Sequence, residues 1–415
     1  MAAVSCRKVF MEYKDFEKWF SGEASGAKTP AYVFSGEELL GRLKMIRENI
    51  DPSFRVAFAM KANPFVTGIL ASAADCLEIC SPGEERICER ADVPPEKMVL
   101  SGVNKEEEDF LRIMKYCSSR GGGAVYTAES TVQAEMLNRA WGCLRESEGK
   151  GQRIKVLLRL TSGNQFGMDE DTIARLIRDR EKYANLDICG LQLYSGTQKS
   201  RPRFFEEEIA AVDAFISRLQ EEFSFITREF EYGPGLFVPY FLKEGNYDDA
   251  GVLHLITELL HKMKWQGQVT LEIGRFLAAY CGYYVTRIME MKENRGVRYC
   301  ILDGGIHQVS YFGQMMAMKH PHMLTKEAAD ETDFKYNLCG SLCTVSDVLV
   351  KEVPLHRAGT GDILVFERTG AYSVTEGISL FLSRDLPRVY MYENEKLTEV
   401  RKQIFTEEWN YGRTD

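Results

Sequence analysis

The sequence predicts an α/β fold in which a (β/α)8 barrel of the TIM type is joined to an all-β domain. Eight short β-type runs alternate with helical patterns between about residues 55 and 272, and eight is the number that closes a parallel barrel. After Arg275 the pattern changes to short strands separated by turns, with almost no helical periodicity before the tail. The length of 415 residues is too great for one ordinary hydrophobic core and sufficient for two domains.

The strands of the barrel are expected to begin near Val56, Cys76, Met98, Ala124, Ile154, Asp187, Arg228 and Gln268. The clearest helix precedes the seventh of them, because apolar residues three or four apart share one face: Phe205, Ile209, Val212, Ile216 and Leu219. Glu206–Glu208 are expected in its first turn, where carboxylates suit the helix dipole. Asp169 is expected to cap a helix from Glu170, and another helix is expected to begin at Asn104 or Lys105.

The second domain shows four strand-like runs, at residues 283–288, 297–302, 347–350 and 361–366. Its sequence also holds a methionine-rich stretch, Met315–Met318, followed by two histidines. This stretch is interpreted either as a mobile loop near the substrate or as a packed core segment.

Composition excludes several classes of function. The formal net charge of -9 argues against nucleic acid or an anionic membrane as the main partner. No run approaches the ~20 apolar residues of a membrane span, and the first residues lack the apolar core of a secretory signal. Eleven scattered cysteines favour reduced thiols and a cytoplasmic protein. Cys339 and Cys343 are four apart without a companion Cys/His cluster, so no metal site is expected.

One lysine stands out in the segment Val56-Ala-Phe-Ala-Met-Lys-Ala-Asn-Pro64. An apolar run of strand type brings Lys61 to the end of the first barrel strand. A lysine at the edge of a dry pocket has a lowered pKa, and its neutral amine is a nucleophile that can form a Schiff base. By itself the pattern is more typical of a surface lysine that ends a buried strand.

The ordered set of short motifs resembles the ornithine/diaminopimelate decarboxylase family, the fold-type III pyridoxal-phosphate decarboxylases. The similarity covers roughly residues 29 to 394, and the motifs that carry it, besides the Lys61 segment, are residues 29–34, 78–84, 165–168, 190–198, 231–235, 272–275, 340–347 and 370–372. The resemblance implies an alanine racemase-like architecture. Residues 1–28 would join the β domain, residues 29–275 would form the cofactor-binding barrel, and residues 276–415 would form a C-terminal β-barrel or sandwich.

The resemblance implies pyridoxal 5'-phosphate as the cofactor, carried by Lys61. Glu272 would hold the pyridine nitrogen protonated, which makes the ring an electron sink. Tyr194 and Gln192 replace two family histidines, and Tyr194 would stack on the ring. Arg159 would lie on the side of the ring oxygen. The remaining cofactor contacts would come from Glu78, where the family usually has Asp, and from a phosphate-binding group: Thr197, Gly233, Gly235, Gly274, Arg275 and Tyr372. Pro234 removes one backbone donor from that group.

The resemblance also implies that Cys343, from the second subunit of a homodimer, returns a proton to the substrate α-carbon. Thr344 and Asp347 would contact the substrate. Diaminopimelate decarboxylases have Glu in place of Thr344, and this acid contacts the distal amine of their substrate. A charge-assisted hydrogen bond of this kind contributes about 1.5–3 kcal/mol. The neutral Thr344 therefore favours the branch that acts on conjugated or carrier-tethered amino acids.

The leading hypothesis is a pyridoxal-phosphate-dependent decarboxylase that removes the α-carboxylate of an L-amino acid or amino-acid conjugate. The alternatives are a diaminopimelate decarboxylase, an amino-acid racemase of the same fold and an inactive regulatory paralogue that binds the cofactor. A single-barrel carrier of the cofactor is a further alternative. Glu272 and Cys343 speak against the racemase, and the ~140 residues after Arg275 speak against the single-barrel carrier. The identity of the substrate is left open.

Overall fold

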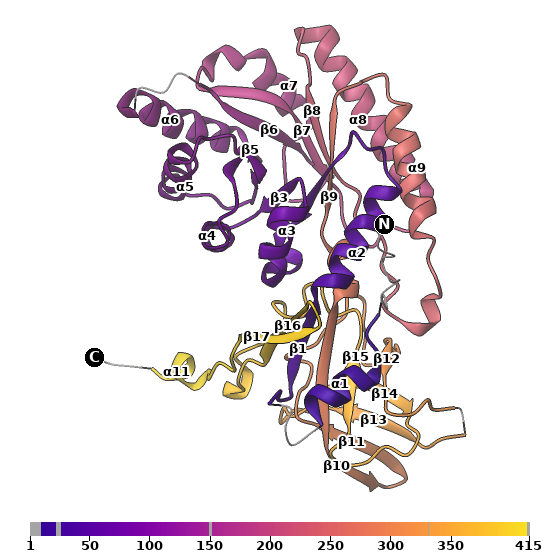
Figure 1. Ribbon diagram of the computed structural model, residues 1–415. Helices are drawn as coiled ribbons and strands as arrows, with labels where there is room; N and C mark the ends of the chain where they lie inside the picture. The colour runs from indigo at the N-terminus through magenta and orange to yellow at the C-terminus, as the bar shows by residue number, and fades with distance from the viewer. Residues whose placement is uncertain (1–9, 22–25, 149–151, 331, 413–415) are drawn as a thin grey trace, which may run out of the picture. The chain divides into compact units, whose positions relative to one another are not determined.

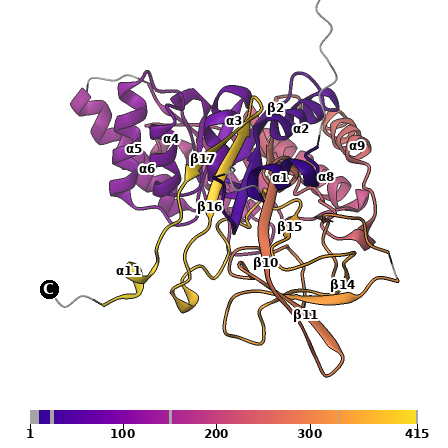
Figure 2. The same ribbon diagram turned by 60° about the horizontal axis from the view of Figure 1, so that its bottom comes forward.

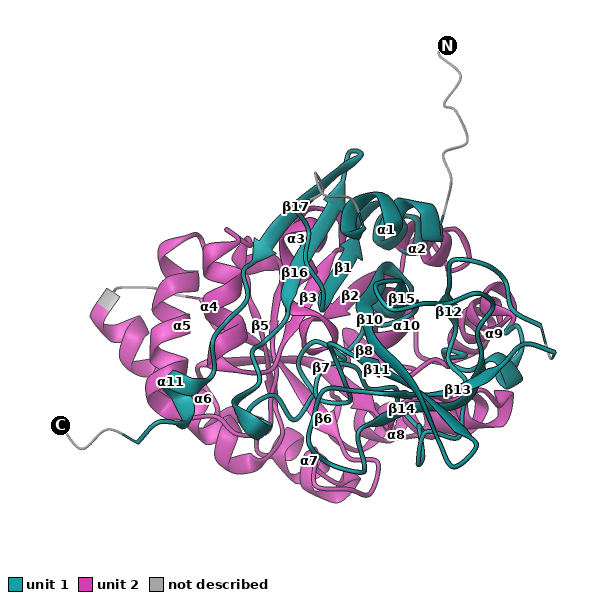
Figure 3. Cartoon of the chain, turned by 90° about the horizontal axis from the view of Figure 1, so that it is seen from below, with its two compact units in different colours: residues 1–42, 238–247, 278–415 teal, residues 43–237, 248–277 magenta. Residues whose placement is uncertain are grey.

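The computed structural model describes residues 10–21, 26–148, 152–330 and 332–412. The described residues form two compact units, coloured separately in Figure 3. Unit 1 is drawn from Met1–Arg42, Val238–Tyr247 and Ala278–Asp415, and unit 2 consists of Leu43–Phe237 and Asp248–Leu277.

Unit 2 is a closed barrel of eight parallel strands, joined edge to edge in chain order (Figure 1). Its strands are β2 (Arg55–Ala59), β3 (Cys76–Ile79), β4 (Met98–Leu100), β5 (Val125–Ala128), β6 (Ile154–Leu160), β7 (Leu186–Tyr194), β8 (Glu229–Gly233) and β9 (Gln268–Ile273). Each lies where the sequence predicts a strand, so the expected barrel is confirmed.

Helices connect successive strands of the barrel, as right-handed crossovers between parallel strands require. They are α3 (Thr67–Ala73), α4 (Pro82–Arg90), α5 (Glu107–Ser119), α6 (Thr131–Glu148), α7 (Glu170–Arg178), α8 (Pro202–Phe223) and α9 (Asp249–His261). Short 3-10 turns lie between them: η1 (Met60–Ala62), η2 (Pro64–Val66), η3 (Pro95–Lys97), η4 (Arg180–Lys182) and η5 (Leu242–Glu244).

Two details of these helices differ from the expectation and one is confirmed. Helix α8 begins at Pro202, so Glu206–Glu208 lie in its second turn and not its first, because proline at the first position already starts the helix. Helix α5 begins at Glu107, two residues after Lys105. Asp169 caps α7 as expected, since its carboxylate accepts a hydrogen bond from the Thr172 backbone N–H at 2.7 Å.

Unit 1 is built on a nine-stranded mixed sheet. Its strands are β1 (Ala31–Ser35), β10 (Gly282–Asn294), β11 (Val297–Leu302), β12 (Met323–Leu324), β13 (Lys335–Cys339), β14 (Val348–Pro354), β15 (Ile363–Phe366), β16 (Arg388–Glu393) and β17 (Lys396–Arg401). The long antiparallel pair β10 and β11 is seen in Figure 2. The other elements of the chain are α1 (Tyr13–Phe20), α2 (Gly36–Glu48), α10 (Arg275–Ala278), α11 (Glu407–Asn410), η6 (Ala279–Cys281) and η7 (Phe381–Ser383).

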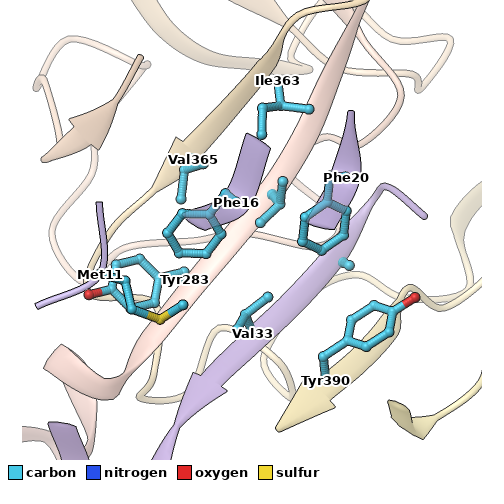
Figure 4. Close-up of a cluster of buried hydrophobic side chains, with 10 residues drawn as sticks. Met11, Phe16, Phe20, Val33, Tyr283, Ile363, Val365 and Tyr390 are labelled. Carbon is cyan, nitrogen blue, oxygen red and sulfur yellow. The ribbon is translucent and has the colours of Figure 1, made fainter. Parts of the chain in front are cut away.

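Helix α1 covers one part of this sheet. Phe16 and Phe20, one helical turn apart, are buried against residues from the strands β1, β10 and β15, as Figure 4 shows. The ring of Phe16 lies 5.0 Å from that of Tyr283. Among the first 28 residues, those from 10 to 21 therefore pack with the β-rich unit, while residues 1–9 and 22–25 lie outside the described residues.

The boundary expected after residue 275 falls after Leu277, and the bounds of the units differ from those of the expected domains at two further places. The segment from residue 29, expected to open the barrel domain, forms β1, which pairs with β10 and with β16 in the sheet of unit 1. Residues 238–247 also belong to unit 1. The sequence around β1 is apolar and β-forming in either setting, so only the pairing partners decide which sheet it joins.

Candidate active site

Lys61 lies directly after strand β2, on the short turn η1, as the sequence predicts. Its Nζ is 2.9 Å from Oε2 of Glu78 and 3.4 Å from Oε1 of Glu272. The same nitrogen lies 5.4 Å from the centre of the Tyr194 ring. About one third of the Lys61 side chain is exposed (34%), whereas both carboxylates are buried. Three elements far apart in sequence thus place two acids and an aromatic ring around one amine.

The interior of the barrel changes from apolar to polar along its strands. Side chains two residues apart on a strand share a face. One buried apolar layer contains Ala57, Cys76, Val99, Val125, Leu157 and Cys189, from six consecutive strands. Two positions beyond four of these residues lie buried polar ones: Glu78, Ser101, Thr127 and Arg159. Gln192, Glu231 and Glu272 are buried polar residues on the remaining strands β7, β8 and β9. The polar residues lie toward the carboxyl ends of the strands, where the sites of barrel enzymes occur.

Three buried carboxyl groups interact electrostatically with Lys61 and with one another, and their pKa values differ as a result. Burial raises the pKa of Glu272, and the neighbouring charge of Glu78 raises it further. Burial also favours the neutral form of Glu78, but the charge of Lys61 and hydrogen bonds from Glu272 and Lys61 outweigh it, so the pKa of Glu78 is lowered. Burial together with the charges of Glu272 and Glu78 raises the pKa of Glu231 to about 8. Like charges in a dry site cannot all ionise, so protons remain on this cluster at neutral pH.

Arg159 is buried on strand β6 and has a partner that the sequence analysis did not identify. Its Nη1 donates to Oε1 of Glu129 at 2.8 Å, and its guanidinium lies 4.8 Å from the ring centre of Phe166. Nε of Arg159 is buried with no hydrogen-bond partner among the described residues. The charge is therefore neutralised by Glu129, while one N–H donor is left for a ligand.

Two glycines at the end of strand β8 leave room beside the cluster. A Cβ at Gly233 would lie 2.7 Å from the ring of Tyr194. At Gly235, φ is +60° and a Cβ would lie 1.8 Å from the carbonyl oxygen of Gly196. Only glycine fits there, so the backbone after β8 approaches the loop after β7 very closely.

Five of the six residues expected to bind a phosphate group, all except Tyr372, lie at the ends of strands β7, β8 and β9 of unit 2. Oγ1 of Thr197, after β7, is 3.1 Å from Nε of Arg275, after β9. A Cβ at Gly274 would lie 3.2 Å from the Cβ of Ala59 at the end of β2. A cationic side chain, a hydroxyl and close backbone approaches are the donors that a phosphate needs. The residues present therefore fit pyridoxal phosphate.

A buried ion pair beneath these loops was not identified from the sequence. Nζ of Lys199 is 2.8 Å from both carboxylate oxygens of Glu208, and it is 2.6 Å from Oγ of Ser195. Glu208 also accepts a hydrogen bond from the Tyr232 hydroxyl at 2.7 Å. The pair joins helix α8 to the ends of β7 and β8. Nothing local marks these residues, because Lys199 stands alone in a polar segment.

Four of the expected site residues lie in unit 1. Cys343 is exposed and Thr344 is half-buried on the loop between β13 and β14. Asp347 is buried at the end of that loop, where its carboxylate accepts backbone hydrogen bonds from Ile306 at 2.9 Å and Leu342 at 2.7 Å. These bonds give Asp347 a structural role in shaping the loop that carries Cys343. Tyr372 has a φ of +68°, a strained conformation for a bulky residue that is often found at functional sites.

The methionine-rich stretch is an exposed loop. Met315, Met316 and Met318 are all largely exposed, and only Ala317 is buried. The interpretation as a packed core segment is therefore wrong.

Other classes of site are not found in the described part of the chain. The described residues hold no group of three or more His, Cys, Asp or Glu that could bind a metal ion. The ten cysteines that the structure describes are all free thiols. A search of the described helices finds none that is both long and apolar enough to cross a membrane.

Comparison with known proteins shows the family to which the chain belongs. A family model described as "Pyridoxal-dependent decarboxylase, C-terminal sheet domain" matches residues 31–370. The chain is 22% identical to the L-glutamyl-[BtrI acyl-carrier protein] decarboxylase of Niallia circulans, over 91% of both chains. It is 24% identical to the 2-[(L-alanin-3-ylcarbamoyl)methyl]-2-hydroxybutanedioate decarboxylase of Staphylococcus aureus, over 88% of this chain and 94% of the other.

Among solved structures, the diaminopimelate decarboxylase of M. jannaschii in complex with L-lysine superposes with a TM-score of 0.78. It shares 23% identity, over 90% of this chain and 89% of the other, and shows that the fold is the same. The family model covers most of the chain and includes Lys61, Glu272 and Cys343. The chain therefore belongs to the pyridoxal-dependent decarboxylase family and is an enzyme of the lyase class.

Proposed function

We propose that this protein removes the α-carboxylate of an L-amino acid that is conjugated to another molecule or tethered to a carrier protein, with pyridoxal 5'-phosphate held in the barrel. The observation that carries the proposal is the position of Lys61, at a strand end and within 3.4 Å of two buried carboxylates.

Lys61 is the residue that would hold the cofactor, because its amine lies at the rim of the polar layer and remains one third exposed. When bound, pyridoxal phosphate supplies an electron sink for the electron pair left at the α-carbon as carbon dioxide departs. Glu272 would hold a proton at the pyridine nitrogen. Burial and the charge of Glu78 raise its pKa to about 7, so Glu272 can hold a proton near neutral pH and would become ionised when a basic nitrogen takes that proton.

The phosphate would be held by the strand-end group described above, with Thr197 and Arg275 as side-chain donors and Gly233, Gly235 and Gly274 allowing close approach. Tyr194 would lie against the ring, since its side chain packs over Gly233. Tyr372 is proposed as an additional phosphate partner from unit 1.

Thr344 supports the choice of substrate class. Its hydroxyl is 3.0 Å from Oγ of Ser346 and carries no charge to pair with a distal ammonium group. Two relatives are named for substrates of the kind proposed: one is carrier-bound L-glutamate, and the other is an alanine unit joined to a hydroxy acid by an amide. The names of both relatives support a substrate whose side chain is neutral or acidic at the end remote from the α-carbon.

A homodimer is proposed, in which Cys343 of one subunit serves the site around Lys61 of the other. Cys343 is exposed on its loop, which suits a group that acts in a shared site. A cytoplasmic location is proposed from the free thiols, which persist in reducing compartments.

The cofactor assignment is tested by borohydride reduction of the purified holoenzyme followed by peptide mapping. The cofactor should be fixed to Lys61. Lys105 is the competing candidate, because it also lies at the barrel interior and burial lowers its pKa to about 8. Lys105→Ala should retain the adduct and Lys61→Ala should lose it. An adduct that maps to Lys105 would remove Lys61 from the proposal.

The substrate class is tested by a matched panel: free L-glutamate, L-glutamate attached to a carrier protein, a small amide conjugate of an amino acid, L-lysine and diaminopimelate. Release of carbon dioxide and the mass of the product are measured for each. The conjugated substrates should turn over, and lysine and diaminopimelate should be poor substrates. Efficient decarboxylation of diaminopimelate would contradict the proposed class while leaving the decarboxylase assignment intact.

A further inference from the structure

Gln192 and Glu231 form a buried pair on adjacent strands that no step of the proposed reaction uses. The two residues are in register on β7 and β8, and both side chains are almost fully buried. Nε2 of Gln192 lies 2.6 Å from Oε1 of Glu231 and 3.3 Å from Oγ of Ser101. Oε1 of Gln192 is buried with no partner among the described residues. A buried amide oxygen that has lost its hydrogen bonds to water and gained none is destabilising, so this arrangement of the amide is unfavourable.

The protonation state of Glu231 determines whether the oxygen or the N–H₂ of the Gln192 amide forms the better hydrogen bond with it. Three groups with charge face Glu231: Glu272 on β9, Glu78 on β3 and Lys61 on η1. Burial and the two acids outweigh Lys61 and raise the pKa of Glu231 to about 8. At neutral pH this carboxyl group therefore carries a proton, and a protonated carboxyl donates a hydrogen bond where a carboxylate can only accept one.

A rotation of the Gln192 amide by 180° pairs its oxygen and leaves its N–H₂ available to a ligand. The two ends of an amide occupy nearly the same volume, so the rotation changes the hydrogen bonds and little else. After it, the amide oxygen accepts from protonated Glu231 and from the hydroxyl of Ser101. Oγ of Ser101 is 3.1 Å from Oγ1 of Thr127, which can donate to Ser101 in turn. The amide N–H₂ then occupies the place of the unpaired oxygen.

Arg159 offers a second donor beside it. Arg159 is the register partner of Gln192 on strand β6, and its Nε is also buried without a partner among the described residues. Glu129 accepts a hydrogen bond from Nη1 of Arg159 at 2.8 Å, so Nε is a donor that this ion pair does not use. Two neighbouring strands therefore present two N–H donors, one cationic and one neutral, and such a pair suits a single anionic oxygen.

We propose that Gln192, with its amide oriented by protonated Glu231, joins Arg159 in binding the ionised phenolic oxygen of pyridoxal phosphate. Gln192 is a binding residue in this assignment and Glu231 is a positioning residue that acts through it. The inference rests on the proposed function, because it requires the cofactor in the barrel. It deepens that function by assigning the ring oxygen to Arg159 and to Gln192, which stands where the family usually has a histidine.

The test compares the binding of pyridoxal phosphate and of 3-deoxypyridoxal phosphate, which lacks the phenolic oxygen, to the full-length apo enzyme. Gln192→Leu should raise the Kd for pyridoxal phosphate about tenfold or more, because it removes a hydrogen bond to a charged oxygen. It should leave the Kd for the deoxy analogue nearly unchanged. An equal loss of affinity for both ligands would mean that Gln192 has only a structural role, and would overturn the proposal.

The role of Glu231 is tested by the ratio of the Kd for the deoxy analogue to the Kd for pyridoxal phosphate as a function of pH, since this ratio reports the contacts to the phenolic oxygen. In the wild type the ratio should fall as the pH rises through about 8, because Glu231 ionises and no longer donates to Gln192. Glu231→Gln keeps a neutral donor at that position, so its ratio should match the wild type at neutral pH and lack this alkaline transition.

Glu229→Gln is the matched control, because Glu229 lies two residues earlier on β8 and pairs with Lys155. It should retain the transition. An alkaline transition that persists unchanged in Glu231→Gln would overturn the assignment of Glu231. If the wild type itself fails to bind pyridoxal phosphate, the proposed function fails and not this inference alone.

Discussion

Around Lys61, three glutamate side chains differ in protonation because their environments differ. Glu78 makes the short contact of 2.9 Å with Lys61 and stays ionised, whereas Glu272 and Glu231 have raised pKa values. A site with one strong anion and two acids that hold protons can accept a cationic ring without excess negative charge. The separation of pKa values among neighbouring acids is a recurring feature of catalytic sites.

Replacing Glu272 by Gln should keep cofactor binding but lower turnover by at least about tenfold, because a neutral amide cannot hold the pyridine nitrogen protonated. The measurement is steady-state release of carbon dioxide, with the cofactor content of the variant read from its absorbance. Glu272→Asp, which keeps a carboxylate, should recover part of the activity. Full turnover in Glu272→Gln would remove Glu272 from the mechanism.

At the scale of elements, strand ends and loops carry the site, and buried polar groups fix those loops. In unit 1 the loop at residues 340–347 folds around Asp347. A Cβ at Gly305 or Gly340 would lie 2.6 Å or less from its carboxylate oxygens, so the backbone closes tightly on this side chain. The loop that carries Cys343 is therefore shaped by one buried acid.

Replacing Asp347 by Ala should lower the free energy of unfolding by about 2 kcal/mol, since two buried backbone N–H groups lose their acceptor. Turnover should also fall, because the loop carrying Cys343 is no longer held. Chemical denaturation and steady-state kinetics measure the two effects. Glu290→Ala, which removes an exposed carboxylate from β10 of the same unit, is the control and should leave both unchanged. Unaltered stability in Asp347→Ala would show that the loop is held by other contacts.

At the scale of the whole molecule, one buried glutamate links segments of unit 1 that are far apart in the sequence. Glu38 of α2 accepts from the Met11 backbone N–H at 3.0 Å and lies 2.8 Å from the Tyr283 hydroxyl. Burial raises the pKa of Glu38 to about 8, even though these hydrogen bonds oppose the rise. The folded protein therefore binds a proton at Glu38 that the unfolded chain releases above its ordinary pKa of 4.5.

The protonated Glu38 contributes stability that is fully present below pH 4.5 and is lost as the pH rises through about 8. Denaturation at pH 5, 7 and 9 should show this loss, with a slope of at most about 1.4 kcal/mol per pH unit from this group. Glu38→Gln keeps a neutral side chain of the same shape and should flatten the decline. An identical decline in the wild type and in Glu38→Gln would assign the pH dependence to other groups.

The proposed shared site is tested by mixing subunits. Cys343→Ala and Lys61→Ala should each turn over poorly. After exchange, a heterodimer would carry both defects in one site and none in the other. Random pairing gives half heterodimers with one good site each, so activity should recover to about a quarter of the wild type. If exchange is confirmed by mass and no activity returns, each site is built from one subunit.

The sequence by itself determined the elements and the position of Lys61. Strand and helix periods are local, so the eight strands of the barrel and the apolar face of α8 could be predicted from the spacing of apolar residues. The Lys61 segment was informative for the same reason, because strand, lysine and turn are contiguous. The family motifs added Glu272, Arg159 and Cys343 as expectations, and their roles stay predictions.

Only the tertiary structure decided which polar groups share a space. Glu231, Glu129 and Lys199 were not identified as site or supporting residues, because their partners lie 9 to 170 residues away and meet them only in the closed barrel. Strand β1 joined the sheet of unit 1 because its edges pair with β10 and β16, which lie more than 240 residues later in the chain. Local sequence sets which face of a strand is polar, but strand register and barrel closure set which faces meet, and these depend on contacts distant in the chain.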